Sequence, residues 1–218
     1  MIEHVYERVS MARYLSNVVI ATDDDRIFKE ARRFGAQVRM TRSDHLSGSD
    51  RVAEVASTYP DAKLIVNVQG DEPLIDPSAI DAAILPMLDE PDAPMGTIAK
   101  RIEQAHEITD PNVVKVVMSQ SGLALYFSRS PIPHGGAAYF KHIGLYVYER
   151  DFLLGYSAMP VGPLEKAERL EQLRALENGH AIRVVETEYE SLGVDTPADL
   201  ERVSQLFEAS LESAKQNG

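Results

Sequence analysis

The sequence has 218 residues, a formal net charge of −12 and no cysteine. A chain of this length can bury a full core, so we expect one domain over residues 1–218. The lack of cysteine excludes disulfides, thiolate zinc sites and a cysteine nucleophile, and the negative charge disfavours nucleic acid as a partner. No apolar run approaches the ~20 residues that span a bilayer and no secretion signal is visible, so we expect a cytoplasmic protein with no membrane partner.

The first part of the chain alternates helices and strands. Apolar residues recur at helical spacing over 1–9, and a strand at 18–22 is followed by a helix that ends at Gly35 and a strand at 37–41. Three acids, residues 23–25, follow the first of these strands. They could hold a metal ion as in glycosyltransferases, but acids also cap helices and stabilise the helix dipole, and we favour a helix start.

The next connection, residues 41–51, is a polar loop with two arginines, a histidine and several hydroxyl groups. Such loops at the end of a strand are more often binding segments than spacers. Ser49 and Asp50 are candidate N-caps for the following helix. A functional interpretation then falls on the remaining polar and small residues Arg42, Ser47, Gly48 and Arg51.

Residues 64–68 form a short apolar, β-branched run that Gly and Pro terminate. This pattern predicts a strand buried on both faces of a parallel sheet that helices cover. Gln69 and Asp71 then lie at the carboxyl end of the strand, where open α/β sheets bind ligands. Asp71 is either a Mg²⁺ ligand or a turn residue ahead of the next helix, and spacing alone does not separate the two.

The middle of the chain predicts a hairpin and a long strand. Strands at 113–118 and 123–127 are joined by a tight turn, which makes the sheet mixed. Residues 130–136 are a candidate mobile flap. The strand at 141–148 alternates, and its polar and aromatic face is either an interface or a pocket wall; this face consists of His142, Gly144, Tyr146 and Tyr148.

The last part of the chain predicts one helix over residues 163–176, a strand at 181–185 and a final helix. Thr196 is the natural N-cap of the final helix and Pro197 its first residue. Asp195 therefore lies one residue outside the helix. It is the second carboxylate that we assign to a metal ion.

Six segments of the chain are considered together: TRSDHLSG (41–48), NVQGDEP (67–73), YFSR (126–129), HIGLY (142–146), LEQLR (170–174) and GVDTP (193–197). They resemble, in the family's order, the 3-deoxy-manno-octulosonate cytidylyltransferases, also called CMP-KDO synthetases. The resemblance implies a Rossmann-like nucleotidyltransferase α/β fold, with a central mixed, mostly parallel sheet flanked by helices. It also implies a homodimer that depends on Mg²⁺ and transfers CMP from CTP to the anomeric hydroxyl of 3-deoxy-manno-octulosonate (KDO), releasing pyrophosphate and supplying lipopolysaccharide biosynthesis.

The resemblance assigns roles to the matching residues. Asp71 and Asp195 would hold Mg²⁺ on the triphosphate, with Gln69 beside the sugar or the nucleotide. These roles fit the chemistry, because metal ions neutralise charge at a transferring phosphoryl group and cationic side chains orient a carboxylate. The cytosine pocket would be lined by Arg42, Ser47 and Gly48 with Arg51 nearby, and the sugar acid would be held by Arg129, His142, Tyr146, Glu171 and Gln172.

One part of the family pattern has no counterpart in this sequence. The family begins with a strand and a basic loop that cradles the triphosphate, whereas residues 1–5 match the helix after that loop. We therefore expect weak catalysis from this chain. A cytidylyltransferase for another acidic sugar and a nucleotide-binding remnant with little catalysis are the alternatives.

The segment 123–156 is also predicted to form a homodimer interface. It is rich in aromatic residues, and exposed aromatic patches mark interfaces that two-fold symmetry completes most economically. The aromatic residues are Tyr126, Phe127, Tyr139, Phe140, Tyr146, Tyr148, Phe152 and Tyr156.

Overall fold

The computed structural model describes residues 1–45, 47–88 and 92–216. Within them, a six-stranded sheet has the strand order β6-β5-β7-β4-β8, with β3 paired to β7 off this path. A second sheet consists of the parallel pair β1 and β2. The strands are β1 (Ile20–Thr22), β2 (Val38–Met40), β3 (Leu64–Asn67), β4 (Met95–Arg101), β5 (Lys115–Met118), β6 (Ala124–Ser128), β7 (Phe140–Glu149) and β8 (Ile182–Glu186).

The main sheet is mixed and mostly antiparallel, so the predicted mostly parallel sheet is wrong. The long strand β7 runs antiparallel to β3, β4 and β5, and β5 runs antiparallel to β6. Only β4 and β8, among the described strands of this sheet, pair in parallel. The apolar run in β3 reflects cover on both faces rather than strand direction, because Ile65 packs in one core cluster and Val66 in the other.

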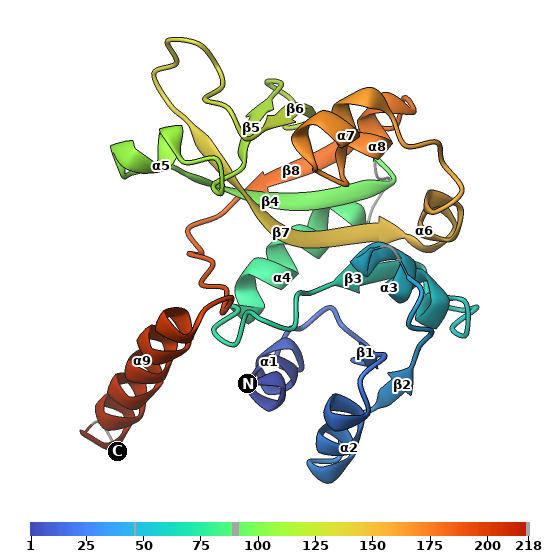
Figure 1. The fold of residues 1–218 in the computed structure, drawn as a ribbon, viewed down its shortest axis with the longest axis vertical. Coiled ribbons are helices and arrows are strands. Elements are labelled where there is room, and N and C mark those ends of the chain that lie inside the picture. Colours follow the sequence, from blue (N-terminus) through green and yellow to red (C-terminus); the bar gives the residue numbers. More distant parts are fainter. Residues whose placement is uncertain (46, 89–91, 217–218) are drawn as a thin grey trace.

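Helices surround the sheet on both faces (Figure 1). In this view β4, β7 and β8 cross the upper half, α7 and α8 lie above them, and α3 and α4 lie below. The helices are α1 (Ile2–Val9), α2 (Asp25–Arg33), α3 (Gly48–Ala56), α4 (Pro77–Ile84), the 3₁₀ turn η1 (Leu85–Met87), α5 (Ala105–Thr109), α6 (Arg150–Tyr156), α7 (Pro163–Glu168), α8 (Leu173–Glu177) and α9 (Pro197–Gln216).

The three acids after β1 start a helix, as predicted. Asp24 is the N-cap of α2, and its carboxylate accepts hydrogen bonds from the backbone N–H groups of Arg26 and Ile27. The Arg26 side chain and these N–H groups lower the pKa of the Asp24 carboxyl group. This carboxylate is therefore already used in capping.

The predicted single helix over residues 163–176 is wrong, because the chain forms two short helices there. Arg169 follows α7 in the left-handed region, with φ 55°. A turn through Glu171 and Gln172 then leads into α8. Helical spacing of leucines gave no sign of this break, which turns Gln172 into the protein interior.

The two faces of β7 pack into different core clusters, as its alternation predicts. Ile143, Leu145 and Val147 join the cluster that includes α4. On the other face, Tyr148 joins Phe127, Tyr156 and Leu173 in a second cluster. The aromatic residues of segment 123–156 were expected to be exposed and to form an interface. This expectation is wrong for Phe127, Tyr148 and Tyr156, which are fully buried within the chain.

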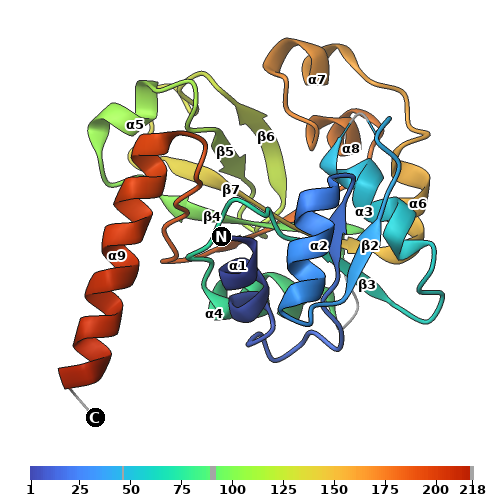
Figure 2. The same ribbon diagram turned by 60° about the horizontal axis from the view of Figure 1, so that its bottom comes forward.

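The last helix, α9, extends away from the sheet in both views (Figures 1 and 2). Its start is the predicted one: Thr196 Oγ1 accepts from the backbone N–H of Asp199, and the Asp199 carboxylate accepts from the N–H of Thr196. The ring of Phe207 contacts that of His4 in α1, with centroids 4.7 Å apart. Among the described residues, no helix has the length and apolar character to cross a membrane.

Candidate active site

Two carboxylates from distant parts of the chain lie close together near the end of β3. Asp71 lies in the turn after β3, and the backbone N–H of Val194 donates to its carbonyl oxygen over 2.9 Å, which brings the next residue, Asp195, to this turn. Burial raises the pKa of Asp71, and the negative charge of Asp195 raises it further. The fold thus unites the two carboxylates that the sequence assigns to a metal ion.

This pair fits a magnesium ion that is shared with a substrate. In the described part of the chain, no group of three or more His, Cys, Asp or Glu side chains is placed to hold a metal ion. Mg²⁺ commonly takes one or two carboxylates together with substrate phosphates and water. A cation would also relieve the repulsion between Asp71 and Asp195 that raises the pKa of Asp71. The two-carboxylate donor set is therefore suited to Mg²⁺ bound with a triphosphate.

Gln69 connects this turn to β7. It lies two residues before Asp71, and a methyl group placed on Gly144 of β7 would lie 3.9 Å from Cγ of Gln69. The small residue at 144 therefore leaves Gln69 beside the polar face of β7. This position joins the carboxylate pair to the cavity along that strand.

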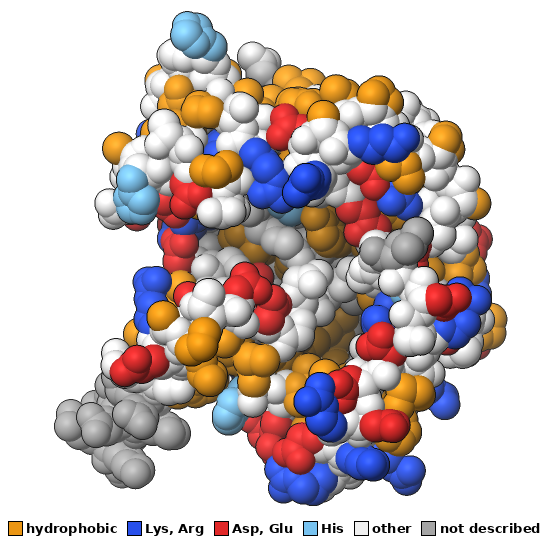
Figure 3. Space-filling model, viewed as in Figure 1, with side chains coloured by type: hydrophobic (Ala, Val, Ile, Leu, Met, Phe, Trp, Pro, Cys, Tyr) orange, Lys and Arg blue, Asp and Glu red, His pale blue; other side chains and the backbone are white. Residues whose placement is uncertain are grey.

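A cavity of about 410 Å³ opens along β7. The face drawn in Figure 3 is hollowed near its centre, with acidic and basic side chains on the rim. Three of the predicted sugar-binding residues, His142, Tyr146 and Gln172, line the cavity together. The other lining residues are Glu107, Asn112, Val113, Val114, Lys141, Ile143, Gly144, Leu170, Glu190 and Ser191.

His142 is held in the neutral form. Burial lowers the pKa of His142 from 6.5 to about 3. Its Nε2 shares a hydrogen bond of 3.0 Å with Oγ1 of Thr97 in β4, and its ring lies 5.3 Å from that of Tyr146. A neutral imidazole can donate or accept a hydrogen bond, but it offers no positive charge to an acid.

Glu171 and Gln172 carry buried polar atoms without partners. Tyr146 donates its hydroxyl to Oε1 of Gln172 over 3.2 Å. Nε2 of Gln172 and Oε1 of Glu171 have no hydrogen-bond partner among the described residues. Burial raises the pKa of Glu171, while the nearby Ser47 and Ser49 hydroxyls and Arg174 oppose the rise. One donor and one acceptor on consecutive residues are therefore available.

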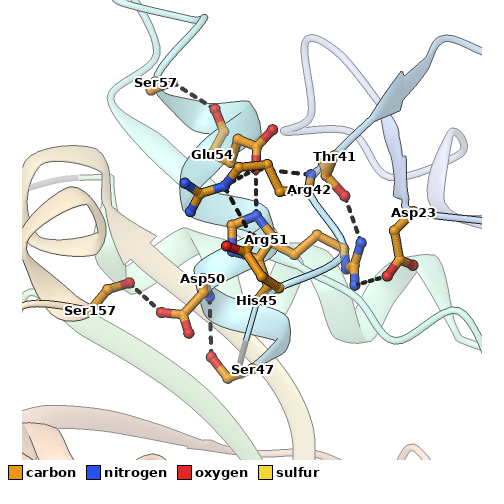
Figure 4. Close-up of polar contacts among 11 residues, drawn as sticks. Asp23, Thr41, Arg42, His45, Ser47, Asp50, Arg51, Glu54, Ser57 and Ser157 are labelled. Atoms are coloured by element: carbon orange, nitrogen blue, oxygen red, sulfur yellow. Dashed lines mark hydrogen bonds and ion pairs between the residues drawn. The ribbon is translucent and has the colours of Figure 1, made fainter.

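Polar residues of the loop before α3 and of its first turn form a cluster at the N-terminus of α3 (Figure 4); these are Thr41, Arg42, His45, Ser47, Asp50 and Arg51. The N-cap of α3 is Ser47, whose side chain accepts from the N–H of Asp50, so the predicted caps Ser49 and Asp50 are wrong. Ser49 instead shares a hydrogen bond of 3.1 Å with the buried Tyr148 hydroxyl. Gly48 is the first residue of α3 and lies beside Asn67 at the end of β3.

The two arginines of this cluster already have acidic or hydroxyl partners. Arg51 donates to Oγ1 of Thr41 over 2.5 Å and pairs with Asp23 at 3.0 Å. Arg42 is exposed and pairs with Asp44 and Glu54 at 3.3 and 3.7 Å. A bound anion would compete with these surface pairs.

Arg129 is not among the residues that line the cavity. Its Nε donates to the carbonyl oxygen of Glu168 over 2.8 Å, and its Nη1 donates to that of Pro111 over 2.9 Å. The Glu168 carboxylate also accepts from the backbone N–H of Arg129. The structure thus fixes Arg129 against neighbouring backbone.

The cavity also contains residues to which the sequence assigned no place in the site. Lys141 lines it directly before His142, and Glu190 and Glu107 pair with Lys141 at its rim. Thr97 supports His142 from β4. The position of Lys141 beside a motif was a usable signal, but its partners come from distant segments and no local pattern indicates them.

Comparison with known proteins gives consistent similarities. Residues 1–184 match the family model described as Cytidylyltransferase. The 3-deoxy-manno-octulosonate cytidylyltransferase of Solibacter usitatus is 66% identical, covering 100% of this chain and 88% of that protein. The enzyme of the same name from Geobacter sulfurreducens is 56% identical, covering 93% and 87%.

Solved structures show the same similarity. CMP:2-keto-3-deoxy-manno-octonic acid synthetase complexed with CTP superposes with a TM-score of 0.91 at 43% identity, covering 96% of this chain and 88% of that one. The 4-diphosphocytidyl-2C-methyl-D-erythritol synthase from Anaerococcus prevotii has a TM-score of 0.65 at 13% identity, which shows a shared fold alone.

Proposed function

Because this chain belongs to the cytidylyltransferase family, and within it to the 3-deoxy-manno-octulosonate cytidylyltransferases, we propose that it transfers CMP from CTP to KDO and releases pyrophosphate. In this reaction the anomeric hydroxyl oxygen of KDO bonds to the α-phosphorus of CTP. The bond from that phosphorus to the pyrophosphate oxygen breaks, and the hydroxyl proton is released. No protein nucleophile is needed.

The unpaired polar atoms of Glu171 and Gln172 carry the proposal. Buried polar atoms are normally hydrogen-bonded, since leaving one unpaired costs about 1–3 kcal/mol. Here a carboxylate oxygen and an amide nitrogen lack partners among the described residues, and Gln172 lines the cavity. A sugar hydroxyl is both donor and acceptor, so a polyhydroxylated ligand would satisfy both atoms.

His142 and Tyr146 would complete the sugar site. Tyr146 already orients Gln172 through its hydroxyl, and His142 is fixed by Thr97. Because the low pKa of His142 keeps its ring neutral, His142 would bind a sugar hydroxyl rather than the sugar carboxylate. The carboxylate requires a cation; we assign it to Arg129, which would have to leave the Pro111 carbonyl, with Lys141 at the cavity as the alternative.

Asp71 and Asp195 would hold Mg²⁺ on the triphosphate. When bound, the ion neutralises charge at the phosphoryl centre and lowers the pKa of a hydroxyl group bound to it. Gln69, which lies between this pair and Gly144, would orient the groups that meet there. The triphosphate held by these carboxylates would then lie next to the cavity that contains the sugar-binding residues, with Gln69 between the two.

The cytosine end would lie at the N-terminus of α3. Arg42, Ser47 and Gly48 would line this pocket, with Arg51 nearby. Ser47 is close enough to Glu171 to lower the pKa of that carboxyl group, so the start of α3 borders the sugar residues. This arrangement supports a nucleotide and a sugar bound side by side.

We also propose a homodimer formed through residues 123–156. Leu125 of β6 is 63% exposed, and β6 ends the strand path of the main sheet. Leu154 of α6 is exposed as well. Exposed apolar side chains gathered in one segment favour burial against a second copy.

The proposed reaction is tested by measuring pyrophosphate release. Release should require CTP, KDO and Mg²⁺ together, and mass spectrometry should identify CMP-KDO. A sialic acid in place of KDO is the control for sugar choice. Release with the sialic acid but not with KDO would contradict the proposal.

A further inference from the structure

The connector between β8 and α9 borders the candidate site at Glu190, Ser191 and Val194. Residues 187–195 form neither helix nor strand and end at Asp195. Glu190 and Ser191 line the 410 Å³ cavity. The same two residues line a second cavity of about 400 Å³, together with Lys100 and Arg202. The connector therefore forms a wall that the two cavities share.

Two alternate residues of the connector bind one buried carboxylate. Tyr189 donates its hydroxyl to Oε2 of Glu72 over 3.0 Å, and Ser191 donates its hydroxyl to Oε1 over 2.7 Å. Glu72 is 7% exposed and directly follows Asp71. Both oxygens of this carboxylate are thus used to hold the connector beside the metal-binding turn.

The residue between them, Glu190, binds in a different direction. Its Oε1 lies 2.5 Å from Nζ of Lys141, and its Oε2 lies 2.9 Å from Nζ of Lys100. Lys100 and Lys141 are directly opposite each other on β4 and β7. Their side chains are only 13% and 12% exposed, so Glu190 bridges two largely buried cations on rigid strands.

The connector is fixed once more next to Asp195. The N–H of Val194 donates to the carbonyl oxygen of Asp71 over 2.9 Å. Tyr189, Glu190, Ser191 and Val194 thus make five contacts with the sheet or with the turn after β3, two of them through Glu190. The last of these residues, Val194, directly precedes Asp195, whose carboxylate lies near that of Asp71.

From this arrangement we infer that Glu72 and Glu190 are positioning residues, which hold the connector so that the Asp195 carboxylate stays beside that of Asp71. The inference rests on the proposed role of Asp71 and Asp195 as Mg²⁺ ligands. Mg²⁺ requires near-ideal octahedral geometry, so displaced ligands bind it poorly. Residues behind the ligands of a metal typically change its affinity by about 10–100-fold.

The position of the connector is tested without metal by amide hydrogen exchange. Glu190→Gln keeps the shape of the side chain but removes the charge that bridges Lys100 and Lys141. The Val194 amide should exchange faster in this variant by about 5-fold or more. Glu188→Gln is the matched control: Glu188 is exposed on the same connector, as Glu190 is, but it forms no ion pair among the described residues, so this exchange should be unchanged. Unchanged exchange in Glu190→Gln would overturn the inference.

Tyr189→Phe tests the other side of the connector, with the ring kept and one hydrogen bond to Glu72 removed. It should also speed exchange at Val194. Thermal unfolding of all variants identifies any general loss of folding. A variant that exchanges faster at every amide of the sheet, and not at the connector in particular, would also count against a positioning role.

The link to the ligand pair is tested with Mn²⁺, whose binding in the presence of CTP is measured by electron paramagnetic resonance. Glu190→Gln should weaken Mn²⁺ binding by about 10-fold, and this loss should disappear in an Asp195→Asn background. Full additivity with Asp195→Asn would overturn the inference. Failure of the proposed metal site can be told apart from failure of this inference, because Asp195→Asn alone would then bind Mn²⁺ like the wild type. In that case the exchange data alone would decide whether Glu190 positions the connector.

Discussion

At the scale of single residues, burial sets the charge that each group of the site carries. The pKa of Asp71 is raised by burial and by Asp195, whereas burial holds His142 neutral. The same principle leaves Glu171 and Gln172 with unpaired atoms. The candidate site thus contains a repelling carboxylate pair and buried polar atoms without hydrogen-bond partners. A bound metal–nucleotide would stabilise the first, and a bound sugar would stabilise the second.

The carboxylate pair gives the first prediction. Asp71→Asn and Asp195→Asn should each lower Mg²⁺-dependent turnover by more than about 100-fold, because each removes a carboxylate that would hold the ion, and the ion neutralises charge on the triphosphate. Steady-state pyrophosphate release and circular dichroism measure activity and folding. Asp61→Asn, a change at an exposed residue, is the control. Wild-type turnover in either site variant would mean that the residue has a structural role.

The buried histidine gives a prediction about pH. The pKa of His142 is about 3 in the folded state, whereas the ordinary value for histidine, which applies to the unfolded chain, is 6.5. Between these values the unfolded chain binds a proton that the native chain does not, so His142 makes the protein less stable as the pH falls from about 7 to about 4. His142→Asn should lessen this dependence.

Urea unfolding at several pH values measures the difference. His134→Asn is the control, because His134 is exposed in the loop before β7. The prediction fails if the pH dependence of the free energy of unfolding is the same in His142→Asn and the wild type.

At the scale of elements, local signals in the sequence predicted where helices and strands begin. Thr196 and Pro197 placed the start of α9, and the position of Asp195 outside α9 followed from its cap. The alternation of residues 141–148 predicted both faces of β7. Each of these features depends on a few neighbouring residues, so it can be recognised from a single sequence.

Features that depend on distant partners could not be predicted in this way. The direction of β3 is set by its pairing with β7, about eighty residues later, and an apolar run looks alike in either direction. The break at Arg169 depends on contacts of Glu165 and Glu168, and no Gly or Pro indicates it. In the site, the pairing of Lys141 with Glu107 and Glu190 likewise joins three remote segments.

The joint between α7 and α8 gives a prediction about stability. Arg174 of α8 donates to both carboxylate oxygens of Glu165 in α7 over 2.9 and 2.6 Å, and both side chains are 10% exposed. Arg174→Met leaves the Glu165 charge buried and unpaired, so we expect a loss of about 3–5 kcal/mol in the free energy of unfolding. The double variant Glu165→Leu/Arg174→Met should recover most of it. Urea unfolding measures the free energy of unfolding of each variant. Equal losses in the single and the double variant would contradict the prediction.

At the scale of the whole molecule, the antiparallel strands place the site between distant segments. β7 pairs with β3, β4 and β5, and so it brings the turn after β3, the Lys100–Lys141 pair and the β5–β6 hairpin together around one strand. The β1–β2 sheet has its own small core cluster of Ile20, Ala31 and Ala36. The middle segment 123–156 thus both lines the site and carries the proposed dimer surface.

The proposed homodimer gives the last prediction. Phe127, Tyr148 and Tyr156 are buried within the chain and cannot meet a partner, so the contact must come from the exposed side chains of the same segment. Leu125 is the most exposed of the large apolar residues there, at 63%. Leu125→Glu places a charge where an interface would exclude water, and an unpaired buried charge is strongly unfavourable. The variant should therefore dissociate at concentrations at which the wild type is dimeric, with a dissociation constant raised by more than about 10-fold.

Sedimentation equilibrium over a range of concentrations measures this constant. Leu85→Glu is the matched control, because Leu85 is 53% exposed but lies outside the segment. A wild-type monomer at micromolar concentration would contradict the dimer itself, whereas equal dissociation constants for Leu125→Glu and Leu85→Glu would place its interface elsewhere on the molecule.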